Sequence, residues 1–105
     1  MYEKSLALLL TERGLSVKCQ YPIPVYFRGV LVGDYYADLF VDDKVIVEPK
    51  AINKLVPEHQ AQLIHYLAAT RTEVGLLINF GRSQLEYKRL RRAQLVDNPD
   101  SPDEL

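Results

Sequence analysis

Two carboxylates and a lysine stand close together in the sequence, in a segment that otherwise has the composition of paired strands. Asp38 lies among apolar residues, and Glu48 and Lys50 follow the apolar run 45–47. If the strands are joined by a three-residue turn at 42–44, Asp38 lies opposite Glu48, with side chains about 5 Å apart. Lys50 projects from the same face as Glu48. Two carboxylates with waters form a common site for Mg²⁺ or Mn²⁺, which would offset the repulsion between like charges.

The length of the turn decides whether this site forms. The three-residue turn also pairs Val41 with Val45, Phe40 with Ile46, and Leu39 with Val47. A two-residue turn would instead pair Asp38 with Pro49 and turn Glu48 to the opposite face, which would separate the carboxylates. An alternative hypothesis keeps the three charges as a structural cluster, in which Lys50 neutralises the acids.

A polar stripe follows on the helix that the sequence predicts over residues 57–70. His59, Gln62 and Tyr66 are spaced i, i+3 and i+7, beside an apolar stripe. Because this helix follows the strand that carries the lysine, Gln62 could orient a ligand or a water, and Tyr66 could contact phosphate or support the lysine. The alternative is an ordinary amphipathic helix with polar boundary residues. His65 falls on a different face, and we predict no role for it.

A dense basic cluster precedes the C-terminal segment of the chain. It consists of Lys88, Arg89, Arg91 and Arg92. These side chains either contact the phosphates of a nucleic acid or form a solvated face. Residues 1–96 hold all 13 Lys and Arg and 10 of the 14 Asp and Glu. We therefore predict one domain over residues 1–96 and an acidic, proline-containing, disordered tail over residues 97–105.

Hydrophobic periodicity predicts the elements that must position these residues. A helix is expected over 2–13, where apolar residues recur at helical spacing and Gly14 follows. The alternation then changes to a period of two, and Pro22 and Pro24 indicate a sheet edge or a bend in place of a central position. The remaining predicted elements are a resumed strand at 25–27, the hairpin strands 35–41 and 45–50, the helix 57–70, a buried strand at 74–80, and a short strand or turn at 84–89. Their order predicts an α/β fold with a mixed sheet flanked by helices.

Composition places limits on the class of protein. A chain of 105 residues forms one modest core. No apolar run approaches the roughly 20 residues of a membrane span, and no signal-peptide pattern is present. The single cysteine, Cys19, has no partner for an internal disulfide, which fits a cytoplasmic location. Its place in an alternating run predicts a small core residue.

Taken together, these pieces resemble the PD-(D/E)XK nuclease superfamily. The resemblance rests on Asp38, the segment Glu48-Pro49-Lys50, and Gln62 with Tyr66 four residues later, as in the RecB-like branch. More closely, the chain resembles the small bacterial GxxExxY proteins. The segments that carry this likeness are "YEKSLALLLTERGLSVKCQYPIPVYFRG", "YYADLFVDDKVIVEPKA", "HQAQLIHYL" and "GLLINFG…YKR".

The resemblance implies a restriction-endonuclease-like αβββαβ core and a metal-dependent nuclease that hydrolyses phosphodiester bonds. Asp38 and Glu48 would bind Mg²⁺ or Mn²⁺, and Lys50 would assist the attacking water and stabilise charge on the phosphate. Gln62 and Tyr66 would be auxiliary residues of the site. The implied substrate is a nucleic acid.

The chain departs from the family pattern at its start and in the strand of the site. Tyr2 matches the last tyrosine of the Gly-x-x-Glu-x-x-Tyr motif, and the motif's glutamate would lie three residues before it, so we expect it to be lacking. Glu3 lies on the same helical face as that position, about 6 Å along the axis. Pro49 stands where the family has an aliphatic residue, which predicts a bend. An uncovered apolar face of the sheet would favour a homodimer.

Three functional hypotheses therefore stand. The first is the metal-dependent nuclease. The second is a catalytically inactive module that binds nucleic acid through the basic cluster, with Arg28 as a further contact. The third is a homodimeric interaction module.

Overall fold

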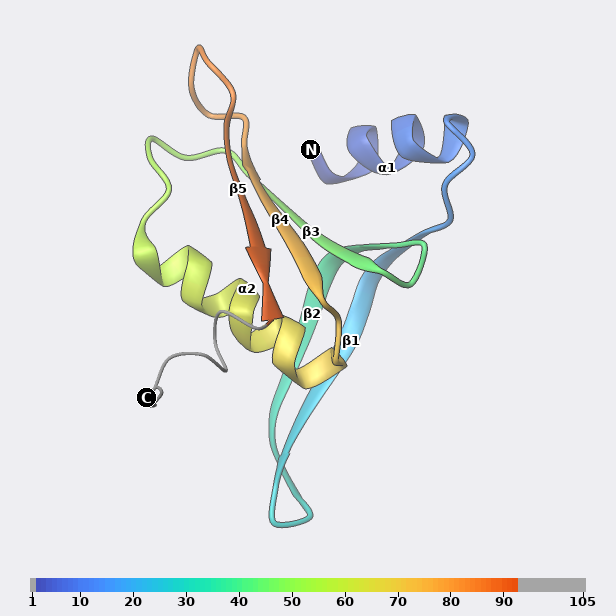
Figure 1. The fold of residues 1–105 in the computed structure, drawn as a ribbon, viewed down its shortest axis with the longest axis vertical. Coiled ribbons are helices and arrows are strands. Elements are labelled where there is room, and N and C mark those ends of the chain that lie inside the picture. Colours follow the sequence, from blue (N-terminus) through green and yellow to red (C-terminus); the bar gives the residue numbers. More distant parts are fainter. Residues whose placement is uncertain (1, 93–105) are drawn as a thin grey trace.

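A computed structural model of the protein describes residues 2–92, which form a five-stranded mixed sheet with one helix on each face (Figure 1). The strands lie in the order β1-β2-β3-β4-β5, and the β3–β4 pair is parallel. The elements are α1 (Tyr2–Glu12), β1 (Val17–Phe27), β2 (Val30–Val41), β3 (Val45–Lys50), α2 (Pro57–Thr70), β4 (Val74–Asn79) and β5 (Glu86–Arg91). This confirms the predicted α/β class and flanking helices. The predicted domain boundary at 96 and the acidic tail lie outside the described residues.

The hairpin of β2 and β3 has the predicted three-residue turn. Asp42 and Asp43 both have positive φ, and the Lys44 N–H donates to the carbonyl of Val41 at 2.9 Å. Three of the predicted pairs are present: Val41 with Val45, Phe40 with Ile46, and Leu39 with Val47. The ladder ends there, so the two strands separate just before Asp38 and Glu48.

Strands β1 and β2 continue past the rest of the sheet as a two-stranded arm, which we define as residues 22–36 (Figure 1). β1 is an edge strand, as Pro22 and Pro24 indicated, and it is continuous across both prolines. The arm carries many exposed large apolar side chains: Tyr26, Phe27, Val30, Leu31, Val32, Tyr35 and Tyr36. Its only charged residues are Arg28 and Asp34.

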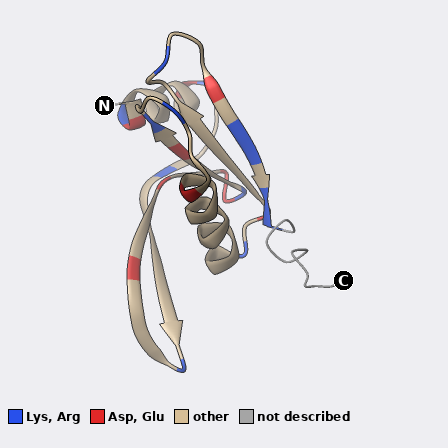
Figure 2. Ribbon diagram, turned by 90° about the vertical axis from the view of Figure 1, so that its left-hand side faces the viewer, with Lys and Arg blue, Asp and Glu red and all other residues tan. Residues whose placement is uncertain are grey.

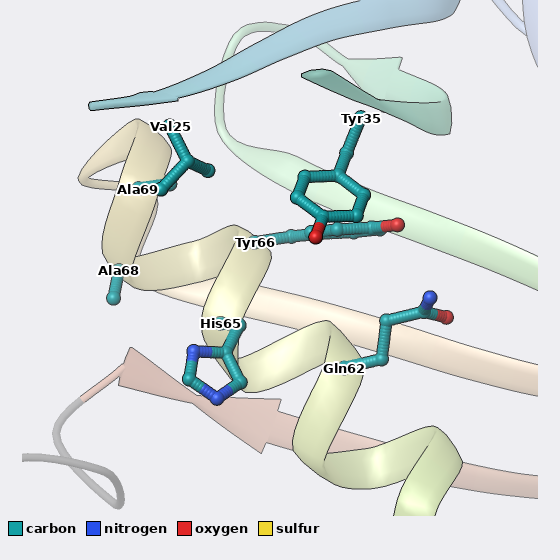
Figure 3. A pocket seen from close by; sticks show the side chains of 7 residues that line it. All are labelled: Val25, Tyr35, Gln62, His65, Tyr66, Ala68 and Ala69. Carbon is teal, nitrogen blue, oxygen red and sulfur yellow. The ribbon is translucent and has the colours of Figure 1, made fainter. Parts of the chain in front are cut away.

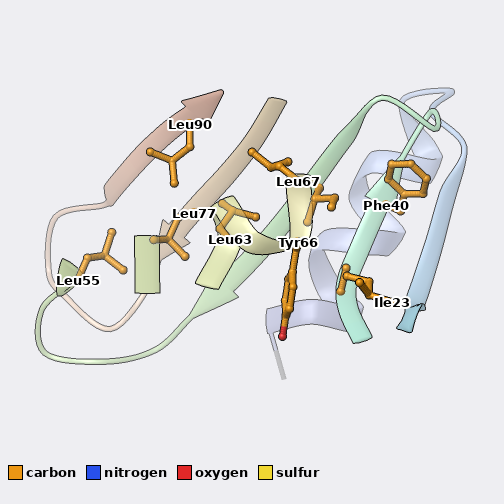
Figure 4. Close-up of a cluster of buried hydrophobic side chains, with 10 residues drawn as sticks. Ile23, Phe40, Leu55, Leu63, Tyr66, Leu67, Leu77 and Leu90 are labelled. Carbon is orange, nitrogen blue, oxygen red and sulfur yellow. The ribbon is translucent and has the colours of Figure 1, made fainter. Parts of the chain in front are cut away.

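Two hydrophobic cores lie on the two faces of the sheet. The larger core fills the space between the sheet and α2, and includes Ile46, Leu63, Leu67 and Leu77 (Figure 4). The smaller core is centred on Leu39, Val41 and Val47 and packs against half-buried residues of α1. No residue of α1 is fully buried, whereas α2 buries three. The face covered by α2 therefore supplies most of the buried apolar packing among the described residues.

The close approach of α2 to the sheet depends on Gly75 in β4. A Cβ at this position would lie 2.9 Å from Leu63 Cγ and 3.0 Å from each of its methyl carbons. The helix begins at Pro57, where the Val56 N–H donates to His59 Nδ1 at 3.1 Å. It ends at Arg71, which is left-handed with φ of 56°. Its height above the sheet is thus set by a glycine and its start by a histidine cap.

Cys19 is exposed, so its prediction as a core residue is wrong. It lies on the edge strand, where alternation of apolar residues does not place every side chain beneath a helix. Within residues 2–92, no helix combines the length and apolar character needed to cross a bilayer.

Candidate active site

Asp38 and Glu48 meet where β2 and β3 separate, and we call them the carboxylate pair. They are not a ladder pair, because the last pair is Leu39 with Val47. Instead, the backbone N–H of Asp38 donates to Glu48 Oε2 at 2.8 Å. A glutamate side chain thus accepts the hydrogen bond that a strand carbonyl would otherwise take. This contact brings the two residues together as the sequence predicted, although by a different geometry.

Pro49 fits this separation of the strands without breaking β3. The Phe80 N–H donates to the carbonyl of Lys50 at 2.7 Å, so Lys50 turns its backbone polar groups toward β4. Because neighbouring residues in a strand turn these groups to opposite sides, the nitrogen of Pro49 faces the side that β2 has left. Its missing N–H therefore costs no ladder bond. β3 runs unbroken to Lys50 and pairs with β4 along its whole length.

Glu48 is buried, with 5 % of its surface exposed. This burial raises the pKa of its carboxyl from 4.5 to about 7. The hydrogen bond from Asp38 and the charge of Lys50 act in the opposite direction, whereas the charges of Asp38 and Glu3 add to the increase. Glu48 Oε1 accepts no hydrogen bond from residues 2–92. Glu48 is therefore a buried carboxylate with one oxygen that accepts no hydrogen bond from the described residues.

Glu3 and Gln20 extend the site toward α1. Gln20 Nε2 donates to Glu3 Oε1 and Oε2 at 3.1 and 2.9 Å, and lies 3.4 Å from Asp38 Oδ1. Burial raises the pKa of the Asp38 carboxyl, and the charge of Glu3 raises it further, while Gln20 and Lys50 lower it. Gln20 itself has φ of 52°, in the left-handed region. Sequence analysis did not single out Gln20, and it judged Glu3 only by its distance along the helix.

Lys50 lies at the end of β3, on the same face as Glu48. Its charge lowers the pKa of both members of the carboxylate pair, which places the ammonium within electrostatic reach of them. The ion pairs of residues 2–92 do not include it. The lysine is thus close enough to influence the carboxylates without being held by one of them.

Gln62 and Tyr66 line a cavity of about 600 Å³ between α2 and the arm (Figure 3). Burial raises the pKa of the Tyr66 hydroxyl, and the charges of Glu48 and Asp38 raise it further. Tyr66 is thus both a lining residue of the cavity and a group that the charges of the carboxylate pair influence. His59, the third member of the predicted stripe, caps the helix instead. His65, for which no role was predicted, lines the same cavity.

The basic cluster does not form one surface. Lys88 pairs with Leu77 of the larger core, so it projects from the face of α2, whereas Arg89 pairs with Leu76 and projects from the face of α1. Arg91 is exposed in the same strand, and Arg92 forms an ion pair with Glu73. Figure 2 shows Lys and Arg along this edge strand. Strand alternation divides a cluster that is dense in sequence between the two faces.

Asn79 is a further residue that sequence analysis missed. It is fully buried, and its Oδ1 accepts hydrogen bonds from the N–H groups of Ile52 and Gly81, both at 3.0 Å. Its Nδ2 donates to the carbonyl of Ile52 at 2.9 Å and to Glu86 Oε1 at 3.0 Å. Asn79 thus fixes the loop that follows Lys50. The signal available in the sequence was a single polar residue, Asn79, near the end of the otherwise apolar run 74–80.

The donor set fits a hard divalent cation. Carboxylate oxygens are the ligands that Mg²⁺ and Mn²⁺ prefer. Glu48 offers an unused buried oxygen. The charge of Glu3 raises the pKa of both Asp38 and Glu48, and that of Asp38 also raises the pKa of Glu48, a repulsion that a cation would offset. Within the described chain, no group of three or more His, Cys, Asp or Glu residues is arranged to hold a metal. The fit therefore rests on two protein carboxylates completed by waters or by substrate oxygens.

Comparison with known proteins agrees with this geometry. The family model described as "PD-(D/E)XK nuclease superfamily" matches residues 1–91. A crystal structure described as that of SSO0001 superposes with a TM-score of 0.62 and 18% sequence identity. The alignment covers 94% of this chain and 55% of that chain, so the protein spans little more than half the length of that structure. No curated protein matches the sequence. The shared mixed sheet with flanking helices is consistent with the restriction-endonuclease-like fold that was expected.

Proposed function

The chain belongs to the PD-(D/E)XK nuclease superfamily, and from this we propose that it is a metal-dependent nuclease that hydrolyses phosphodiester bonds in nucleic acid. The observation that carries the proposal is the buried Glu48 carboxylate, held by the Asp38 N–H beside Lys50 at the point where β2 and β3 separate. We also propose the finer assignment to the RecB-like branch and to the GxxExxY proteins. It is supported by Tyr2, which matches the motif's last tyrosine and stacks on Phe80 at 4.8 Å between ring centroids.

Asp38 and Glu48 would hold Mg²⁺ or Mn²⁺. When bound, such an ion supplies Lewis-acid polarisation of a phosphoryl oxygen and lowers the pKa of a coordinated water. The hydrogen bond from the Asp38 N–H orients the Glu48 carboxylate, and Gln20 orients Asp38 from the other side. Glu3 holds Gln20 in place through both of its carboxylate oxygens. The carboxylate pair is therefore positioned before any ligand arrives.

Lys50 would neutralise charge on the phosphate that is cleaved and position the attacking water. Its contribution would be electrostatic, as a positive charge placed beside the phosphate. Gln62 and Tyr66 would orient the nucleotide from the α2 side. Contacts to more distant phosphates would come from Lys88, Arg89, Arg91 and Arg92, and from Arg28 at the tip of the arm. Because these cations lie on different faces, they would contact separate parts of the nucleic acid.

A cleavage assay tests the proposal. Labelled single- and double-stranded DNA and RNA are incubated with the protein and Mg²⁺ or Mn²⁺, alongside Lys50→Ala. A matched control is Lys44→Ala, because Lys44 is exposed in the turn before the same strand. We expect cleavage by the wild type and by Lys44→Ala, and its loss in Lys50→Ala. Absence of cleavage by the folded wild type would reject the nuclease, and salt-sensitive binding would then favour a nucleic-acid-binding module.

Self-association is a second candidate, because the arm exposes seven large apolar side chains. On the α1 face, Ile78 is only half-buried and Tyr87 is exposed. Such surface favours contact with a second copy of the chain. Light scattering at micromolar concentration should then report a dimer, and Phe27→Ser with Leu31→Ser should shift it toward the monomer. A wild type that remains monomeric would reject this candidate.

A further inference from the structure

A groove separates the arm from α2, and nothing in the family match assigns it a ligand. It has a volume of about 600 Å³, within the range of small-molecule sites. Tyr35 and Val25 contribute from the arm, whereas Gln62, His65, Tyr66 and two alanines contribute from α2 (Figure 3). We call it the tyrosine groove. Tyr66, which lines the groove, also belongs to the larger core together with Ala37, the residue before Asp38, and the charges of Glu48 and Asp38 raise the pKa of its hydroxyl.

The Tyr35 ring is held in a defined orientation. Its centroid lies 6.1 Å from that of Tyr66, with the two planes tilted by 44°. Tyr35 also folds over Gly33, where a Cβ would lie 2.5 Å from Tyr35 Cε2. Only glycine leaves room for the ring in this position. Yet Tyr35 keeps 48 % of its surface exposed, so a ring surface remains available for another planar group.

The chemistry of the walls selects the type of ligand. None of the lining residues is Lys or Arg, so the groove offers no cation to a phosphate. An aliphatic ligand would leave the amide of Gln62, the imidazole of His65 and the tyrosine hydroxyls without partners. A flat heteroaromatic group with donors and acceptors around its edge matches both features. In a nucleic acid, that group is the base.

We propose that the tyrosine groove binds an unpaired nucleobase of the strand whose phosphate lies at Asp38 and Glu48, with Tyr35 as the stacking surface. This inference rests on the proposed function for the position of the phosphate. A base can enter the groove only if it is unstacked from its neighbours and freed from its complement. The groove therefore selects single-stranded or frayed strands over intact duplex.

The test is binding of a short fluorescein-labelled strand to the full chain, measured by fluorescence anisotropy with Ca²⁺. The strand is offered single-stranded as DNA and as RNA, as a blunt duplex, and as a single strand without bases. Tyr35→Ala should weaken binding of the single strand by about 5- to 150-fold, the range expected for one lost base–aromatic stack. Tyr35→Phe keeps the stacking ring and should lose far less affinity than Tyr35→Ala. Tyr36→Ala is the matched control, because Tyr36 is its neighbour, is equally exposed and does not line the groove.

The strand without bases should bind the wild type and Tyr35→Ala equally. The proposal would be overturned if Tyr35→Ala lost as much affinity for the strand without bases as for the strand with bases, or if Tyr36→Ala lost as much as Tyr35→Ala. It would also be overturned by duplex binding as tight as single-strand binding, or by no binding at all. Melting curves by circular dichroism show whether Tyr35→Ala is folded, and Gly33→Ala provides a second variant that should weaken binding by displacing the ring. Cleavage that is insensitive to Tyr35 would reject the groove but keep the nuclease. Tyr35-dependent binding without cleavage would keep the groove but reject the nuclease.

Discussion

The backbone N–H of Asp38 donates to Glu48 Oε2 at the place where the ladder between their strands ends. Strand separation creates the room in which two carboxylates can face a common ligand. The hydrogen bond compensates part of the cost of burying Glu48, and the remainder appears as its raised pKa. The separation of the two strands therefore accounts both for the positions of the two carboxylates and for the electrostatics at Glu48.

Divalent cations should stabilise the protein through the carboxylate pair. Mn²⁺ at about 100 times its dissociation constant would add about 2.7 kcal/mol to the free energy of unfolding. For a domain of this size, that is a rise in melting temperature of about 10 °C or more. Asp38→Asn should abolish the rise, as measured by differential scanning fluorimetry. Asp34→Asn, an exposed aspartate of the same strand, should retain it. An equal rise in Asp38→Asn would place the metal elsewhere.

The metal-free protein should lose stability as pH rises from about 4.5 to about 7. In this interval the folded state, with the pKa of Glu48 at about 7, binds more protons than the unfolded state, with a pKa of 4.5. The stability held at low pH is thus lost as Glu48 ionises in its buried site. The difference amounts to roughly 3 kcal/mol at most. Urea unfolding at several pH values, in the presence of a chelator, measures it.

Glu48→Gln should flatten this pH profile and be more stable than the wild type above pH 7, because the amide oxygen can still accept from Asp38 without a charge. Glu12→Gln serves as the control, since Glu12 is exposed at the end of α1. A pH slope that persists in Glu48→Gln would assign the titration to another group.

Gly75→Ala should destabilise the fold by about 1–3 kcal/mol, because its Cβ would overlap Leu63 and push α2 away from the sheet. A double-mutant cycle with Leu63→Ala isolates the clash. The double variant should be less destabilised than the sum of the two single variants, because removing the leucine frees the space that the new methyl needs. Additive losses in thermal unfolding would show that the overlap is relieved by other movements.

Asn79→Ala should cost about 2–4 kcal/mol, because it removes four hydrogen bonds of a fully buried side chain, including those to the backbone of Ile52 and Gly81. Its midpoint of urea unfolding should fall accordingly. Asn53→Ala, an exposed residue in the same loop, should leave the midpoint nearly unchanged. If both variants unfold alike, the network around Asn79 contributes little.

The site was predictable where local sequence sets geometry. The turn at Asp42 and Asp43 fixes the register of β2 and β3, and that register brings Asp38 and Glu48 together. The position of Gln20 was not predictable in this way. A register shift between Val25 and Tyr26 moves β1 by one residue relative to the turn at the arm's tip. Counting back from that turn would place Gln20 beside Ala37 instead of Asp38, and no local pattern indicates such a bulge.

The placement of the basic cluster was also not predictable from the sequence alone. Its density in the sequence suggested one surface, but a strand turns successive side chains to opposite faces. Lys88 and Arg89 therefore diverge. Tyr35 gave no signal either, since its role depends on the absence of a side chain at Gly33 and on a helix far away in the sequence.

Gln20 keeps a left-handed backbone, which costs an ordinary residue about 1 kcal/mol or more that glycine would not incur. Its amide is also the link between Glu3 and Asp38. Laboratory evolution that selects only for thermal resistance would therefore favour glycine here and dismantle the link. Under the proposed nuclease function, selection for cleavage would favour glutamine instead. A library screened under both pressures would then separate into two populations at this position.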